Sequence, residues 1–240
     1  MALFTEEAVR ANLRVRDGKR VFYLAAGDKL SPAAREWLRQ QHVQILPAAE
    51  AKVTRYTTLF GATLTEKPEH MTHLRGNILV MKDHPRIAFR GEIDALEADI
   101  LLAMHAAKAE GKSQTLADLR EILQFVRSLI PADVLEETVV FSTLCGMTPS
   151  ELRDRSHFPQ KYYDQPHFMP DEEDSKTLLY VNQVRTSVRK AERAAFAAFR
   201  TPEGGVTRED ILLALNRLSS LCWILMIRLR GEERRNDESR

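Results

Sequence analysis

Three arginines follow one another at steps of four in the segment VRTSVRKAERAAFAAF, and their type and spacing suit the binding of a large anion. They are Arg185, Arg189 and Arg193, with Glu192 beside the last of them. On one helix face such like charges repel by roughly a few tenths of a kcal/mol per pair. Water, acidic side chains or a polyanionic ligand must therefore neutralise this arginine stripe. Arginine bonds phosphate oxygens in bidentate fashion, so a triphosphate site is one interpretation. A solvated helix face with salt bridges is the other.

A second polar stripe interrupts the apolar segment ILLALNRLSSLCWILMIRLRG, residues 211–231. Steps of four and three predict a helix packed in a bundle. Its buried seam is expected to be Ile211, Leu215, Leu218, Cys222, Leu225 and Leu229. Asn216, Ser219 and Trp223 fall on an adjoining face of the same helix. The question is whether this face and the arginine stripe meet in one site.

The composition is that of an ordinary globular protein, and the chain is expected to be cytoplasmic. Hydrophobic residues make up 44% and charged residues 29% of the chain. A formal net charge of +1 argues against a general nucleic-acid binder. The amino-terminal stretch has acidic residues and no long apolar region, so it is no signal peptide. Residues 221–229 are too short and too close to charge to span a membrane.

The elements that must position these side chains are mostly helices. Residues 1–68 predict a small α/β appendage, with strands at VFYLA and VQIL and a helix that Ser31 caps. Residues 69–232 predict a bundle of four to five helices, and residues 233–240 a disordered charged tail. Helices are expected over 86–110, 115–129, 151–156 and 175–199, and from VTRED to the helix end at Gly231. Pro131 should stop the second, Thr148 and Thr207 should act as caps, and the stretch SHFPQKYYDQPHFMPDEED should be irregular.

Three segments resemble the ATP:corrinoid adenosyltransferases in the same order and with similar spacing. The family pattern KDxPR…GxxDEL is represented by KDHPRIAFRGEIDAL, RRAER by RKAER, and LNRLSD by LNRLSS. The ethanolamine-utilisation type is most similar, because it shares the THL segment and the connection SHxPxxYxDxxHxxP. The resemblance spans about residues 70–231.

The resemblance implies an enzyme that transfers the 5′-deoxyadenosyl group of ATP to the cobalt of reduced cobalamin and releases triphosphate. Cobalt(I) is itself the nucleophile, so the protein would hold ATP and stabilise the leaving group. By similarity, the ATP-binding residues are Thr72, His73, Lys82, Arg189, Lys190, Glu192, Arg193 and Asn216. Arg193 would pair with the phosphates. Asp94 would pair with Arg189 across a subunit boundary, the alternative being a surface pair of Asp94 with Arg90.

The same resemblance implies Mg2+ with the ATP, cobalamin as the second substrate, and a homo-oligomer, either a trimer or a dimer. It also suggests a cobalamin-dependent ammonia-lyase and a bacterial microcompartment as partners. An apolar chamber for the corrinoid would draw on the aromatic connection, through Phe158, Tyr163, His167 and Phe168.

The sequence departs from the family in two places. The glycine-containing phosphate loop TGDxGxT of its best-known group is represented only by Thr72. No cysteine precedes Cys145, so the cysteine metal motif of many ethanolamine-type members cannot form, and no metal site from protein side chains is expected. Two other functions remain open: a non-catalytic corrinoid-binding or delivery module, and a helical scaffold protein.

Overall fold

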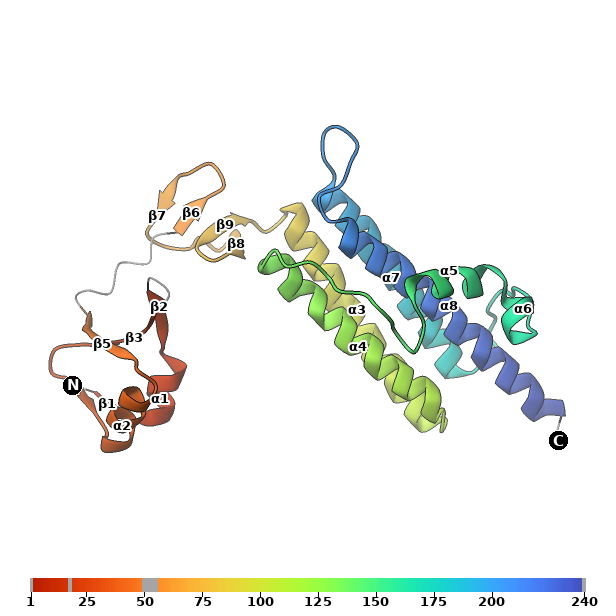
Figure 1. Ribbon diagram of the computed structural model, residues 1–240, viewed down its shortest axis with the longest axis horizontal. Helices are drawn as coiled ribbons and strands as arrows, with labels where there is room; N and C mark the ends of the chain where they lie inside the picture. The colour runs from red at the N-terminus through yellow and green to blue at the C-terminus, as the bar shows by residue number, and fades with distance from the viewer. Residues whose placement is uncertain (1, 17–18, 49–55, 239–240) are drawn as a thin grey trace. The chain divides into compact units, whose positions relative to one another are not determined.

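The computed structural model describes residues 2–16, 19–48 and 56–238 of the 240-residue chain. The chain folds into two compact units (Figure 1). The first comprises Met1–Glu69 and Asn77–Leu79, and the second comprises His70–Gly76 and Val80–Arg240. Each unit has a hydrophobic core of its own.

The first unit is a small α/β structure. Its elements are β1 (Leu3–Phe4), α1 (Glu6–Ala11), β2 (Arg14–Arg16), β3 (Lys19–Leu24), β4 (Lys29–Leu30), α2 (Pro32–Gln40), β5 (Gln44–Pro47), β6 (Tyr56–Thr58) and β7 (Thr63–Leu64). β3 pairs antiparallel with β2 and parallel with β5. The Ser31 hydroxyl accepts the amide N–H of Ala34 and so caps α2. The two expected strands and the capped helix between them are therefore confirmed.

The remaining strands are β8 (Met71–Arg75) and β9 (Ile78–Met81), and they form a sheet of order β7-β6-β9-β8. β6 pairs parallel with β9 and antiparallel with β7. β8 carries Thr72 and His73, and β9 leads through residues 82–84 into the first long helix.

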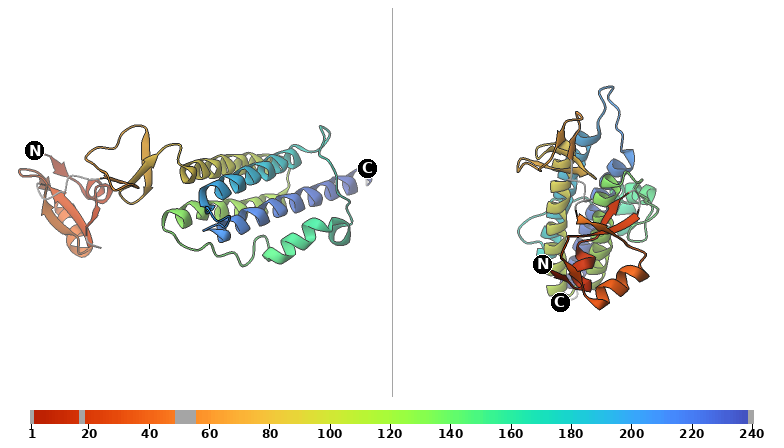
Figure 2. Two further views of the ribbon diagram at one scale, coloured as in Figure 1. Left: turned by 90° about the horizontal axis from the view of Figure 1, so that it is seen from above. Right: turned by 90° about the vertical axis from the view of Figure 1, so that its left-hand side faces the viewer.

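The second unit is a helical bundle (Figure 2). Its helices are α3 (Pro85–Ala109), α4 (Ser113–Val134), α5 (Pro149–His157), α6 (Pro159–Tyr163), α7 (Lys176–Phe199) and α8 (Glu209–Glu238). α7 packs against both α3 and α8, α3 also packs against α4, and α5 packs against α8. The predicted seam of α8 is at most 1% exposed along its whole length. The predicted helical bundle with a small α/β appendage is confirmed.

Two helices continue past the residues at which they were expected to end, Pro131 and Gly231. α4 continues through Pro131 to Val134, because Ala132 and Asp133 are buried and the missing N–H costs only one bond in the last turn. α8 passes Gly231 and extends to Glu238, so the expected disordered tail is helical as far as the structure describes it; residues 239 and 240 lie outside the described part.

Two local expectations near these helices also need correction. α8 begins at Glu209, and the Thr207 hydroxyl donates to the carbonyl oxygen of Phe199 rather than capping the helix. The aromatic connection contains α6 and is therefore not wholly irregular. Thr148, by contrast, caps α5 as expected, in a capping box with Glu151.

By length and composition α8 could cross a membrane over Glu209–Arg235, so its shortness was the wrong argument against a span. Of its most apolar window, 56% is buried inside the bundle. Packing against α7, α5 and α4 accounts for the apolar character of this helix.

A hairpin-like connection joins α7 to α8. Arg200 and Val206 form an antiparallel bridge, and the amide of Thr201 donates to the carbonyl oxygen of Gly205 at 2.8 Å. Gly204 has a φ of +87°, a conformation that favours glycine. These bonds hold the two helix ends together and fix which residues of α7 lie opposite which residues of α8.

Candidate functional site

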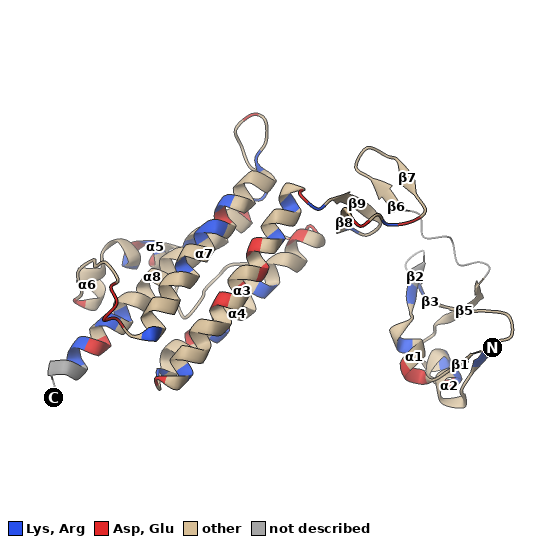
Figure 3. Ribbon diagram, turned by 180° about the vertical axis from the view of Figure 1, so that it is seen from behind, with Lys and Arg blue, Asp and Glu red and all other residues tan. Residues whose placement is uncertain are grey.

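The arginine stripe lies on α7, next to the face that this helix buries. Val181, Val184, Val188, Ala191 and Ala195 are all 0% exposed, at steps of three and four. Ser175 caps the helix by accepting the amide N–H of Leu178. Arg185 is half-buried, whereas Arg189 and Arg193 are exposed. Figure 3 shows several basic positions along α7.

The three guanidinium groups have no carboxylate partner in the described part of the chain. Arg185 bonds only the side-chain oxygen of Asn182, at 2.9 and 3.1 Å, and Arg189 and Arg193 bond no described residue. Burial, and then the charge of Arg189, lowers the pKa of Arg185 below its ordinary value. Salt bridges with described residues therefore do not neutralise the stripe, which leaves solvent, an acidic partner or a polyanion.

α7 and α8 bring two of the expected nucleotide residues together. The side-chain amide of Asn216 donates to the Glu192 carboxylate at 2.9 Å. One step further along the pair, the Arg185 guanidinium lies 5.8 Å from the ring centre of Trp223. Both contacts are seven residues apart on each helix, which is about 10 Å along the axis. Arg189 of α7 and Ser219 of α8 lie between these two contacts. The two polar stripes therefore lie side by side along the line where α7 packs against α8, which we call the α7–α8 seam.

The residues ahead of α3 lie at one end of this seam. Phe89 of α3 packs edge-on against Phe199 of α7, with ring centres 5.5 Å apart. Arg193 precedes Phe199 by six residues, or about 9 Å along the helix. β8 is attached to the same end through Arg90, which donates to the carbonyl oxygens of Leu74 and His73 at 2.8 and 3.4 Å. Arg90 thus holds the backbone of β8, the strand that carries Thr72 and His73, against α3. The backbone N–H of Lys82 donates to the carbonyl oxygen of His70 at 3.0 Å.

Two expected site residues point elsewhere within the single chain. The ammonium group of Lys190 lies 3.8 Å from the Glu92 carboxylate of α3, away from Asn216. Asp94 is exposed on α3 and bonds no described residue, Arg189 included. The alternative pairing of Asp94 with Arg90 is wrong, because Arg90 bonds Asp133. A contact of Asp94 with Arg189 across a subunit boundary stays a prediction.

His84 begins α3 as an unusual cap, since its ring nitrogen Nδ1 accepts the amide N–H of Arg86 at 3.2 Å. Burial, and then the charges of Arg86 and Arg90, lowers the pKa of His84 below its ordinary value of 6.5. A protonated ring could no longer accept this bond.

We expect His84 to make the protein less stable as the pH falls from about 6.5 towards the lowered pKa of the folded state, because the unfolded chain then binds the proton first. His84→Asn keeps a capping side chain that does not titrate. Urea unfolding at pH 7.5 and pH 5 should show a smaller pH dependence in His84→Asn, by about 0.5–2 kcal/mol for a cap. Equal pH dependence in both proteins would contradict this role.

The aromatic residues expected to contact the corrinoid fall into two groups. His167 and Phe168 stack on Trp223, with ring centres 5.8 and 5.2 Å apart. Phe158 and His167 line a shallow hollow of about 610 Å³, together with His157, Pro159, Gln160, Lys161 and Pro166. Tyr163 lines a neighbouring polar hollow instead. Trp223 therefore contacts both this aromatic group and the Arg185 guanidinium. The sequence placed Trp223 on the polar face of its helix but did not predict these contacts.

Burial keeps both cysteine thiols protonated in this structure. Burial raises the pKa of the Cys222 thiol to about 12, and burial followed by the charge of Asp118 raises that of Cys145 well above its usual range. Among the described residues there is no group of three His, Cys, Asp or Glu side chains that could hold a metal ion.

With this bundle and this seam, the chain matches a known protein family over most of its length. The family is described as cobalamin adenosyltransferase, and its sequence profile matches residues 62–229. The chain belongs to the cobalamin adenosyltransferase family and is a transferase.

Individual relatives agree with this assignment. The corrinoid adenosyltransferase EutT of Escherichia coli strain K12 is 30% identical over 246 aligned positions, covering 93% of this chain and 90% of the relative. The protein of that name from Salmonella typhimurium strain LT2 is 29% identical, with the same coverage.

Solved structures match the fold. A variant PduO-type ATP:corrinoid adenosyltransferase from Lactobacillus reuteri, complexed with cobalamin and ATP, superimposes with a TM-score of 0.53. Its sequence is 18% identical, and the match covers 68% of this chain and 90% of that one. A second variant, complexed with ATP, gives a TM-score of 0.51 at 18% identity, covering 66% and 87%. The helical bundle is therefore the fold of the PduO-type enzymes.

Proposed function

We propose that the chain is an ATP:cob(I)alamin adenosyltransferase. The observation that carries the proposal is the arginine stripe of α7, which has no carboxylate partner in the described chain and shares the seam with Asn216 of α8. Family membership and relatives named corrinoid adenosyltransferases support the same activity. As an extension, the ethanolamine-type resemblance makes ethanolamine utilisation the process that the enzyme serves.

The reaction needs little covalent chemistry from the protein. Cobalt(I) donates its electron pair to C5′ of ATP, a cobalt–carbon bond forms, and the bond from C5′ to oxygen breaks with its electrons on the leaving triphosphate. Negative charge thus grows on the triphosphate in the transition state. Arg193 and Arg189 would stabilise it, Asn216 and Glu192 would bind the nucleoside part, and Mg2+ would enter bound to ATP.

The corrinoid would lie at the aromatic end of the seam. The rings of His167 and Phe168 stack on Trp223. Phe158, which lines the adjoining hollow together with His167, is 56% exposed. Only about 10 Å of helix separates this group from the contact between Asn216 and Glu192. ATP at one end and a corrinoid at the other would thus present C5′ to the metal.

Loss of the Trp223 ring should weaken the corrinoid selectively. We expect Trp223→Ala to raise KM for cob(I)alamin about 10-fold, since two aromatic stacks are worth about 0.5–1.5 kcal/mol each. KM for ATP should change less than about twofold. Phe125→Ala is the matched control, because Phe125 is a partly buried ring that packs on Phe141 at 4.9 Å. Equal effects on both substrates would count against this assignment.

Assembly and location are parts of the same proposal. We place the ATP site between neighbouring subunits of a homo-oligomer, because Asp94 and Arg189 both lack a bonding partner among the described residues. The family resemblance favours a trimer over a dimer. We also propose a cytoplasmic enzyme that supplies a cobalamin-dependent ammonia-lyase, in association with a microcompartment.

A direct assay tests the activity. The purified protein is incubated with ATP, Mg2+ and chemically reduced cobalamin, and the light-sensitive adenosyl product is followed by absorbance. Product above a heat-inactivated control is expected, together with release of one triphosphate per product. No product, with tight binding of adenosylcobalamin and no binding of ATP, would instead indicate a corrinoid-delivery module. Binding of neither ligand would indicate a scaffold protein.

A further inference from the structure

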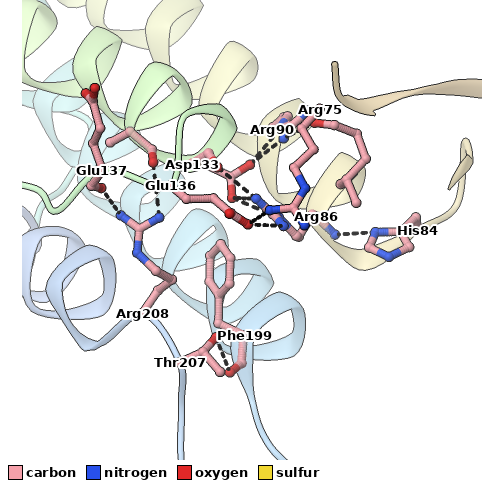
Figure 4. Close-up of polar contacts among 12 residues, drawn as sticks. Arg75, His84, Arg86, Arg90, Asp133, Glu136, Glu137, Phe199, Thr207 and Arg208 are labelled. Carbon is pink, nitrogen blue, oxygen red and sulfur yellow. Dashed lines mark hydrogen bonds and ion pairs between the residues drawn. The ribbon is translucent and has the colours of Figure 1, made fainter. Parts of the chain in front are cut away.

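A buried carboxylate at the end of α4 organises the segment that precedes α3. Asp133 is 0% exposed, and both of its oxygen atoms are occupied (Figure 4). Oδ1 accepts from Nε of Arg86 at 2.9 Å, and Oδ2 accepts from Nε of Arg90 at 2.8 Å. Arg86 also donates to the Asp133 carbonyl oxygen at 2.8 Å. One acidic residue thus holds two arginines on successive turns of α3.

Arg90 extends this contact to β8. While its Nε bonds Asp133, its Nη2 donates to the carbonyl oxygen of Leu74 at 2.8 Å and its Nη1 to that of His73 at 3.4 Å. The planar guanidinium is rigid, so fixing one edge fixes the direction of the other. A second ion pair, between Arg75 of β8 and Glu136 just after α4, ties the same strand to the same helix end.

Stability alone is a weak reason for such a cluster. Buried ion pairs lose much of their attraction to desolvation, and apolar side chains of similar size often serve as well. What an apolar cluster could not supply is directed hydrogen bonds to two consecutive carbonyl groups of β8. The cluster therefore contributes the position of the β8 backbone.

We propose that Asp133 is a positioning residue for ATP, acting through Arg90 on the backbone of Thr72–Leu74. This inference rests on the proposed function, which assigns Thr72 and His73 to the nucleotide. In this proposal Asp133 and Arg90 act on ATP indirectly, without contacting it. Asp133 orients Arg90, Arg90 holds the carbonyl groups of His73 and Leu74, and these set where the side chains of Thr72 and His73 lie.

Asp118 offers a matched control on the same helix. It is 5% exposed and pairs with Arg228 of α8 at 2.9 Å, so it too is a buried carboxylate held by an arginine. It lies fifteen residues before Asp133 on α4, about 22 Å along the helix, and its partner does not reach β8.

The test compares Asp133→Asn with Asp118→Asn. Equilibrium binding of ATP with Mg2+ is measured by calorimetry without corrinoid, at a temperature where both variants are folded by circular dichroism. Asp133→Asn should weaken ATP at least about 10-fold, and Asp118→Asn less than about twofold. Hydrogen exchange of the peptide covering residues 70–76 should accelerate in Asp133→Asn only. Arg90→Lys, which keeps the charge but loses the rigid fork, should match Asp133→Asn, and the double variant should be no worse than either.

Equal ATP affinity in Asp133→Asn and Asp118→Asn would overturn the inference. If Asp133→Asn does not fold, Arg90→Lys is compared with Asp118→Asn under the same two criteria. Failure of the proposed function has another signature, since the unsubstituted protein would then fail to bind ATP or form product.

Discussion

Replacing Arg193 with alanine is expected to lower kcat at least about 100-fold. Loss of one preorganised contact to developing charge costs about 2.7–4 kcal/mol of transition-state stabilisation. Arg193 is exposed and bonds no described residue, so its removal should leave the fold unchanged. Product formation under saturating ATP and cob(I)alamin is the measurement, with thermal unfolding as the check on folding.

Arg120→Ala is the matched control for this prediction. Arg120 is an exposed arginine of α4 that likewise bonds no described residue, so the two variants lose the same side chain. The control should retain full activity. If kcat of Arg193→Ala lies within about threefold of kcat of Arg120→Ala, Arg193 does not stabilise the leaving group. Arg189 would then be the next candidate for that role.

Charge reversal at Asp94 and Arg189 should have the second largest effect, and it acts on assembly. If these residues pair between subunits, Asp94→Arg and Arg189→Asp should each place like charges together, and the oligomer should dissociate to smaller species. Close interfacial charge pairs have coupling energies of about 1.5–7 kcal/mol, so each reversal should raise the subunit dissociation constant at least about 10-fold. Sedimentation velocity over a concentration series measures it.

The double variant decides this second prediction. Asp94→Arg combined with Arg189→Asp restores opposite charges in reversed order and should recover most of the assembly. Its activity should stay low, because Arg189 is also expected to contact ATP. Asp99→Arg is no suitable comparison, since Asp99 bonds Gln183 and Ser187 within the chain. Identical sedimentation of all four proteins would refute the pairing.

Periodicity predicted the helices well because packing and pattern agree there. Leu218 and Cys222 stand at steps of four and three within α8, and both are completely buried. Single proline and glycine residues predicted the helix ends less well. Pro131 and Gly231 lie inside helices, since tertiary packing of α4 and continued hydrogen bonding in α8 outweigh a local cost of about 1–3 kcal/mol.

The candidate site was only partly accessible from the sequence. The motif segments pointed to Glu192 and Asn216, and these residues do meet. Asp133 was missed because its partners lie 43 and 47 residues away, beyond any local pattern. A signal existed nevertheless: an aspartate stands in the largely apolar stretch LIPADVL, and an acid that is buried among apolar residues needs a cationic partner.

The hairpin-like connection between α7 and α8 limits how this sequence can vary in length. Extra residues at its tip, beside Gly204, would enlarge an exposed loop and leave every facing pair of residues intact. One extra residue between Arg193 and Phe199 would instead turn the whole arginine stripe by about 100° and carry it about 1.5 Å along the axis. Related chains that retain the activity should therefore differ freely in loop length here, while the spacing from Arg193 to the helix end stays constant.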